Sequence, residues 1–262
     1  MYRTQNTDLS EVCRLRTAQN CHDRTALRQQ RLMKMRGSDT MNEQFTHFYE
    51  KFGFDAKDVK VLKQFTVSTD PNQIVQLVKR IRLTSKQLSK DTTLTEPSEA
   101  EEKFYDLLVT HNCHKKLIQL LTQQLPSDLL SDVMYILTNI SSSESHLTNA
   151  LYYSNIIEVL KPYLYDQNVL ENVLNILSNI TVEGVQMRDA VFNTCAKDVL
   201  VTALKIQKPI VMEAVFNLIL NFSRHTPKIE LTLFKPYLDF IEQNCSKDSL
   251  SLVITTLQTY TE

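Results

Sequence analysis

Three asparagines recur at nearly even spacing, and their side chains could form a row of hydrogen-bonding groups. Asn139, Asn179 and Asn221 are separated by 40 and 42 residues, each near the end of an apolar segment of helical period. Because a carboxamide both donates and accepts hydrogen bonds, such a row could bind the backbone of an extended peptide. The side chains four and eight positions before each asparagine share its helical face.

Those neighbouring positions add candidate binding groups. Glu171 and Glu213 lie eight residues before two of the asparagines, where their carboxylates would attract Lys or Arg side chains. An asparagine near a helix end can instead satisfy loose carbonyl groups or cap the next turn, so a structural role stays open. The candidate peptide-groove residues are Tyr135, Asn139, Glu171, Asn175, Asn179, Glu213, Asn217 and Asn221.

The sequence predicts no catalytic residues, cofactor or metal ion. The six histidines share no repeat position, and no Ser/His/Asp or HExxH motif is present. With only 3 glycines, the chain has no glycine-rich phosphate loop. The segment His111-Asn112-Cys113-His114 resembles half of a zinc site, but it lacks a second pair of ligands.

Composition bounds the class of protein. The 262 residues are 42% hydrophobic and 23% charged, as in an ordinary soluble protein. The five cysteines have no paired spacing and the N-terminus lacks a secretory signal, so reduced thiols in the cytosol or nucleus are expected, with an organellar assembly also compatible. No apolar run approaches the length of a membrane span, and no nucleic-acid partner is expected.

Repeats of about 40 residues indicate a helical solenoid. A helix is expected from Asp70 to about Ser85, followed by an exposed loop over 86–97. Long helices are expected at about 127–141, 168–181, 209–223 and 247–260, with two shorter helices between successive long ones. Thr259 takes the asparagine position in the last of these, as in a degenerate closing repeat.

The junctions between the shorter helices also repeat. Asn112, Asn155 and Asn193 lie 43 and 38 residues apart. A sharp turn between helices needs a left-handed residue, for which Asn is the best choice after Gly. We therefore expect a turn at each of the three.

Three regions are expected. Residues 1–40 form an arm with eight Lys/Arg and four Asp/Glu, so the arm carries +4 and the remainder −5. Residues 41–69 are an aromatic-rich lead-in that packs on the first repeat, and residues 70–262 hold the repeats.

The three-helix units, whose third helix ends in a Leu-Thr/Ser-Asn-Ile-like signature, resemble the armadillo repeat and more narrowly the importin-α (karyopherin-α) family. The resemblance implies an all-α, armadillo-type right-handed helical solenoid of about five repeats with a basic N-terminal arm. In that family the third helices line a peptide groove with a W-x-x-x-N motif. This chain keeps the asparagines but has no Trp, so the family's usual nuclear-localisation peptide should bind weakly or not at all.

The arm resembles the family's importin-β-binding segment through Arg14, Arg16, Arg24, Arg28, Arg31, Lys34 and Arg36. It could bind an importin-β-type carrier, fold onto the acidic body, or contact a neighbour in a multi-subunit assembly. Two functions follow as hypotheses, both with protein partners. One is a non-enzymatic armadillo scaffold or structural subunit of importin-α-like ancestry, and the other is a divergent nuclear-import adaptor.

Overall fold

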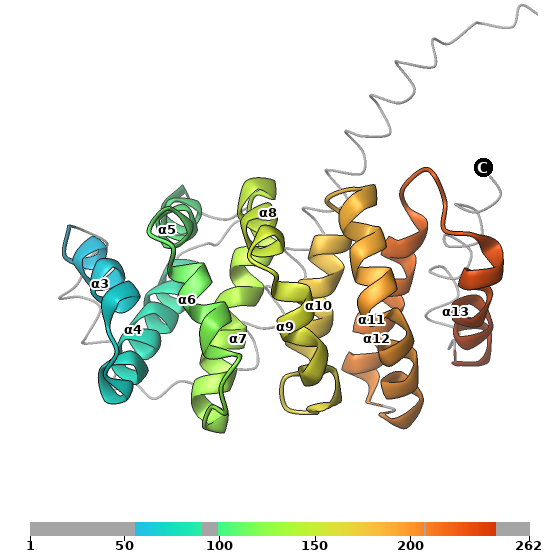
Figure 1. Ribbon diagram of the computed structural model, residues 1–262, viewed down its shortest axis with the longest axis horizontal. Helices are drawn as coiled ribbons and strands as arrows, with labels where there is room; N and C mark the ends of the chain where they lie inside the picture. Colours follow the sequence, from blue (N-terminus) through green and yellow to red (C-terminus); the bar gives the residue numbers. More distant parts are fainter. Residues whose placement is uncertain (1–55, 91–98, 207, 245–262) are drawn as a thin grey trace, which may run out of the picture.

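The computed structural model describes residues 56–90, 99–206 and 208–244. Every regular element in these ranges is helical, and the helices stack side by side into one elongated array (Figure 1). Among these described helices, none combines the length and the apolar character that crossing a membrane requires.

The helices fall into successive units along the array. The first unit comprises α3 (Ala56–Val67) and α4 (Pro71–Lys90). The second comprises α5 (Glu99–Thr110), α6 (Cys113–Leu120) and α7 (Ser127–Ser142). The third comprises α8 (Ser145–Tyr153), α9 (Ile156–Leu160), the 3₁₀ helix η2 (Lys161–Tyr165) and α10 (Leu170–Thr181). The fourth comprises α11 (Val185–Lys205) and α12 (Pro209–Ser223), and α13 (Leu231–Asn244) follows.

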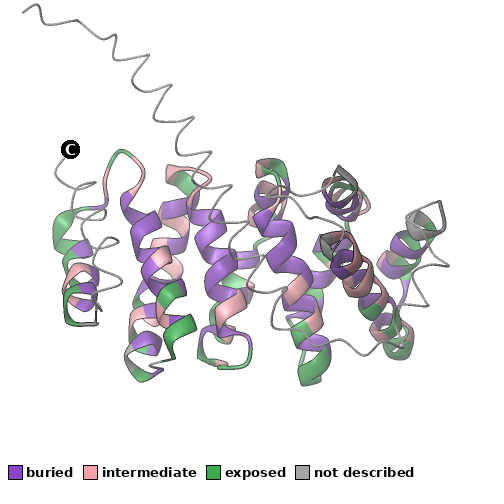
Figure 2. Cartoon of the chain, turned by 180° about the vertical axis from the view of Figure 1, so that it is seen from behind, coloured by how far each residue is buried: buried purple, intermediate pink, exposed green. Residues whose placement is uncertain are grey.

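The last helix of each of these four units packs against its counterpart in the next unit. In this way α4, α7, α10 and α12 form a continuous layer, here called the third-helix layer. Most of its residues are buried, as the view from behind shows (Figure 2). Apolar side chains on all sides, such as Val133, Ile136 and Leu137 of α7, fill the space between units. Because each unit buries its apolar face only against its neighbours, the stack has one continuous core.

Two of the three predicted asparagine turns are confirmed. Asn112 (φ 58°) immediately precedes α6, and Asn155 (φ 63°) immediately precedes α9. They are the only non-glycine residues with positive φ in the described part of the chain. The left-handed conformation lets the chain turn sharply between two short helices, as expected of Asn.

The third predicted turn, at Asn193, is wrong. α11 runs without a break from Val185 to Lys205, so one helix replaces the two shorter helices expected between 181 and 209, and Asn193 lies inside it. Asn is only moderately unfavourable in a helix interior, and packing outweighs that preference. The neighbouring Phe192 contacts the rings of Phe222 and Tyr237, with centroids 5.2 and 5.4 Å away.

The boundaries of the other predicted helices are close to those observed, with one exception. The helix expected to end near Ser85 continues to Lys90, so the first part of the predicted loop is helical. Ser85 and Lys86 are buried against neighbouring helices, which explains why this polar stretch is helical. The helix expected at 247–260, the arm and residues 41–55 lie outside the described residues. The rest of the lead-in is α3, which packs against α4 and α6.

Candidate functional site: the third-helix layer

The three repeated asparagines lie between the third helices and join them. Asn139 Nδ2 donates to Ser85 Oγ at 3.1 Å, which links α7 to α4. Asn179 Nδ2 donates to Ser141 Oγ at 3.0 Å, linking α10 to α7. These two side chains are 1% and 3% exposed. A buried amide is costly to desolvate unless it is hydrogen-bonded, and a hydroxyl group on the preceding helix accepts from each NH2 group here, while Asn139 Oδ1 has no hydrogen-bond partner among the described residues.

Asn221 repeats the arrangement between α12 and α10. Its Nδ2 donates to Ser178 Oγ at 2.7 Å and to the Ser178 carbonyl at 3.3 Å, and the side chain is 4% exposed. Near the end of α7, the Asn139 carbonyl accepts hydrogen bonds from two side chains that follow it in the chain. Ser142 and Ser143 each donate to it at 2.9 Å. Sequence analysis missed this inter-helix role, although a Ser on each preceding third helix was a visible signal.

The remaining candidate groove residues lie four or eight positions before the asparagines on the same helices. Tyr135, Asn217 and Glu171 are half-buried, Glu213 is exposed and Asn175 is buried. The guanidinium of Arg82 on α4 lies 4.9 Å from the centre of the Tyr135 ring, close enough for a cation–π contact. The layer therefore brings these residues onto adjacent helices. Their role in peptide binding stays a prediction.

Two pairs of contacts define how successive third helices align. Arg82 of α4 forms an ion pair with Asp132 of α7, with Nε and Oδ1 2.7 Å apart. One unit later, Asn172 of α10 donates to Thr138 of α7 at 3.2 Å. Asp132 and Asn172 are equivalent positions, because they are 40 residues apart like Asn139 and Asn179. Their partners Arg82 and Thr138 are therefore equivalent positions of α4 and α7, 56 residues apart. Ser85 and Ser141, whose hydroxyl groups accept from Asn139 and Asn179, are also 56 residues apart.

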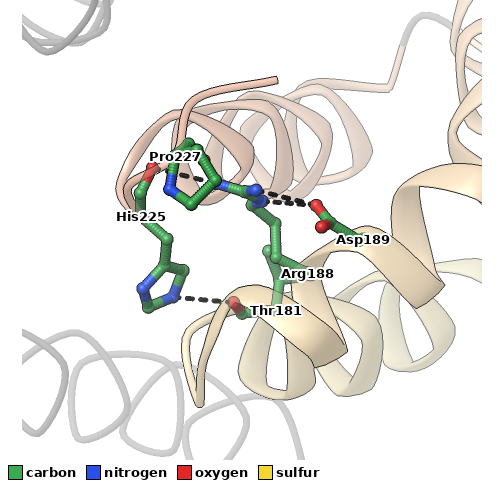
Figure 3. Close-up of polar contacts among 5 residues, drawn as sticks. All are labelled: Thr181, Arg188, Asp189, His225 and Pro227. Atoms are coloured by element: carbon green, nitrogen blue, oxygen red, sulfur yellow. Dashed lines mark hydrogen bonds and ion pairs between the residues drawn. The ribbon is translucent and has the colours of Figure 1, made fainter. Parts of the chain in front are cut away.

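A polar cluster around Arg188 contacts the segment that connects α12 and α13 (Figure 3). Arg188 of α11 is 1% exposed, and its Nη1 donates to the carbonyls of His225 and Pro227 at 2.9 and 2.7 Å. Its Nε and Nη2 contact Asp189 Oδ1 at 2.9 and 2.8 Å. The His225 ring donates from Nε2 to the Thr181 carbonyl at 3.1 Å, since a carbonyl only accepts. Burial lowers the pKa of His225, so the ring is neutral at pH 7.

The His111–His114 segment has a structural position. Cys113 Sγ is buried 3.6 Å from the Leu62 carbonyl, and burial raises its pKa to about 12. Burial lowers the pKa of His114 to about 4. No group of three potential ligands for a metal ion occurs in the ranges that the structure describes. The seven candidate Arg and Lys residues of the arm lie outside those ranges.

Similar folds occur among solved structures. A designed armadillo repeat protein in complex with the peptide (KR)4 is 13% identical, with a TM-score of 0.61, covering 88% of this chain and 91% of that one. Computationally designed armadillo repeat proteins for modular peptide recognition give 13% identity and a TM-score of 0.56, covering 77% and 98%. No protein-family model matches the sequence, and no curated protein is significantly similar to it. The predicted all-α armadillo fold is thereby confirmed.

Proposed function

We propose that this chain is a non-enzymatic armadillo scaffold that binds an extended segment of a partner protein along its third-helix layer. The observation that carries the proposal is the row formed by Tyr135, Glu171 and Glu213 on three adjacent helices of that layer. Carboxylates at successive helices favour Lys or Arg side chains of a segment that crosses the helices. The similarity to a designed protein that holds the peptide (KR)4 adds support.

The arrangement of the asparagines favours a scaffold over an import adaptor. In the importin-α family, which the repeats resemble, the asparagines face a bound peptide next to tryptophans. Here the amide groups of Asn139, Asn179 and Asn221 donate to the neighbouring helix and hold the units together. The chain also has no Trp to pack against lysine stems. Binding would therefore depend on the half-buried and exposed side chains that lie one and two turns before the asparagines.

A binding assay with the peptide (KR)4 tests the proposal. We expect fluorescence anisotropy to show binding by the full chain, and Glu171→Lys with Glu213→Lys to weaken it at least about tenfold, since each removes a charge-assisted contact. The matched control is Glu144→Lys with Glu158→Lys, which reverses two exposed carboxylates outside the third-helix layer, one immediately before α8 and one on α9. Absence of binding, or an equal loss in the control, would contradict the proposal.

The adaptor function remains a second candidate because of the basic arm. Residues 1–40 carry a net charge of +4 and resemble an importin-β-binding segment. As an adaptor, the full chain should bind an importin-β-type carrier in a pull-down, and a chain that lacks residues 1–40 should not. Equal binding by both forms would rule this candidate out.

A further inference from the structure

We propose that the segment bound to the third-helix layer is bipolar, with acidic residues over α4 and basic residues over α10 and α12. This inference rests on the proposed function and specifies the chemistry of the partner. Its starting point is the division of charge within the layer. α4 contains five Lys/Arg and no Asp/Glu. α7, α10 and α12 together contain four Asp/Glu and no Lys/Arg.

The alignment of the helices places these charges in one row. The shift of 56 residues between α4 and α7 puts Lys79 at the position of Tyr135. The spacing of the asparagines puts Tyr135, Asn175 and Asn217 at equivalent positions of their helices. Glu171 and Glu213 lie one turn before the last two of these, on the same helical face. The row therefore runs from a cation on the first helix to carboxylates on the third and fourth.

Lys79 is the group of α4 best placed to meet a ligand. It is exposed, and it lies one turn before Arg82 on the same side of the helix. Arg82 already contacts the side chains of Asp132 and Tyr135 on α7. This contact shows that the cationic side of α4 faces along the layer toward α7. An acidic residue of a bound segment that reached α4 would meet Lys79, while a basic residue there would be repelled.

Helix spacing sets the distance between the charges of the partner. Packed helices lie about 8–10 Å apart, and an extended chain advances about 3.3 Å per residue, so the segment advances about three residues per helix. Two basic residues about three positions apart would pair with Glu171 and Glu213. An acidic residue about six positions beyond the nearer of them would pair with Lys79. Charge alone leaves the chain direction open, so both directions are tested.

Peptides of one composition but different charge order provide the test. The first has two Glu at its N-terminus and two Arg, three positions apart, toward its C-terminus, with Gly and Ser between them. The second is the same sequence reversed, and the third alternates the charges. We expect the better of the first two to bind the full chain at least about tenfold more tightly than the third, because only it meets charges of opposite sign at both ends.

The variant Lys79→Glu tests whether α4 is the helix that binds the acidic end of the peptide. It should weaken the better bipolar peptide about tenfold and leave (KR)4 binding equal or stronger, since it replaces a cation by a carboxylate. Lys115→Glu, which reverses an exposed lysine on α6, is the control and should change neither. If (KR)4 binds but the isomers bind equally, or Lys79→Glu has no effect, only the bipolar inference is overturned. If neither (KR)4 nor any isomer binds, the proposed function itself fails.

Discussion

A buried asparagine recurs in the second, third and fourth units, and its role is structural. Asn139, Asn179 and Asn221 recur because each faces a serine of the preceding third helix. The sequence pattern revealed the spacing but could not show the burial, because the serines precede them by 54, 38 and 43 residues. Only the stacking of helices brings donor and acceptor together. The apolar positions around them were predictable from their helical period.

Replacing Asn179 by Ala should therefore destabilise the fold. The change removes the donor to Ser141 Oγ and leaves that buried hydroxyl without the bond, at a cost of about 1–3 kcal/mol. Asn217→Ala, on a half-buried side chain of α12, should cost about 0.5 kcal/mol or less. The midpoints of urea unfolding measure both. Equal midpoints for the two variants would mean that the hydrogen bond between Asn179 and Ser141 does not stabilise the stack of helices.

His114 should make stability depend on pH. Its pKa is lowered to about 4 by burial, the ring is 3% exposed, and Nδ1 has no hydrogen-bond partner among the described residues. Above pH 6.5 the ring is neutral in both the folded and unfolded states. As pH falls from 6.5 to about 4, only the unfolded state binds the proton, so stability decreases by about 1.4 kcal/mol per unit.

The variant that checks this effect is His114→Gln. The difference between its urea midpoints at pH 7 and pH 5 should be smaller than in the parent chain, because the buried titrating ring is gone. Gln119→Ala, at an exposed and non-titrating side chain of the same helix, should leave the difference unchanged. A parent-like pH dependence in His114→Gln would contradict the assignment.

At the scale of elements, similar sequence signals lead to different structures. Asn112 and Asn155 turn the chain, whereas Asn193 continues a helix. Local preference allowed a turn at each, because Asn tolerates both conformations. Contacts of Phe192 with Phe222 and Tyr237 are long-range, so the sequence could not indicate that the third site would differ.

Glycine and alanine substitutions should separate these cases. Asn112→Ala and Asn155→Ala keep the β-carbon at φ 58° and 63° but lose the short polar side chain that makes this conformation acceptable for Asn, at a cost of up to about 1–2 kcal/mol. The Gly variants should be nearly neutral. At Asn193 the order should invert, because Ala favours a helix and Gly disfavours it. Thermal unfolding of the six variants measures the order. The same order at all three sites would contradict the continuous α11.

Arg188 acts on an element that lies beyond its own helix. Arg188→Met should leave the carbonyls of His225 and Pro227 without their donor and cost about 1.5–3 kcal/mol. Hydrogen exchange followed by mass spectrometry should show that the variant exchanges faster than the parent chain in 224–230 and α13, while the exchange of α7 changes less. Lys197→Met, at an exposed lysine of the same helix, is the control. Unchanged exchange next to α13 would show that the connection is held by other contacts.

At the scale of the whole molecule, the order of the third helices separates positive from negative charge along one layer. α4 is cationic and the next three third helices are anionic, although the chain as a whole has a net charge of only −1. Total composition conceals this division. Partner binding should depend mainly on electrostatic attraction to charged side chains of this layer. Folding should depend mainly on burial of the apolar core.

Salt should therefore weaken peptide binding far more than it weakens folding. Screening shortens the range of surface charges from about 10 Å at 0.1 M salt to about 3 Å at 1 M. We expect the affinity for (KR)4 to fall steeply over this range, while the urea midpoint stays the same or rises. Parallel titrations and unfolding curves at the two salt concentrations measure this. A salt-independent affinity would show that apolar contacts dominate binding.

The sequence by itself determined the helical class, the unit length and most helix boundaries of this protein. Those properties follow from local periodicity and turn residues, which act within a few positions of the chain. Tertiary structure alone decided that the asparagines join neighbouring helices, that Asn193 lies within a helix and that Lys79 aligns with Tyr135. These depend on contacts between residues about 30–54 positions apart, and such contacts exist only once the units are stacked.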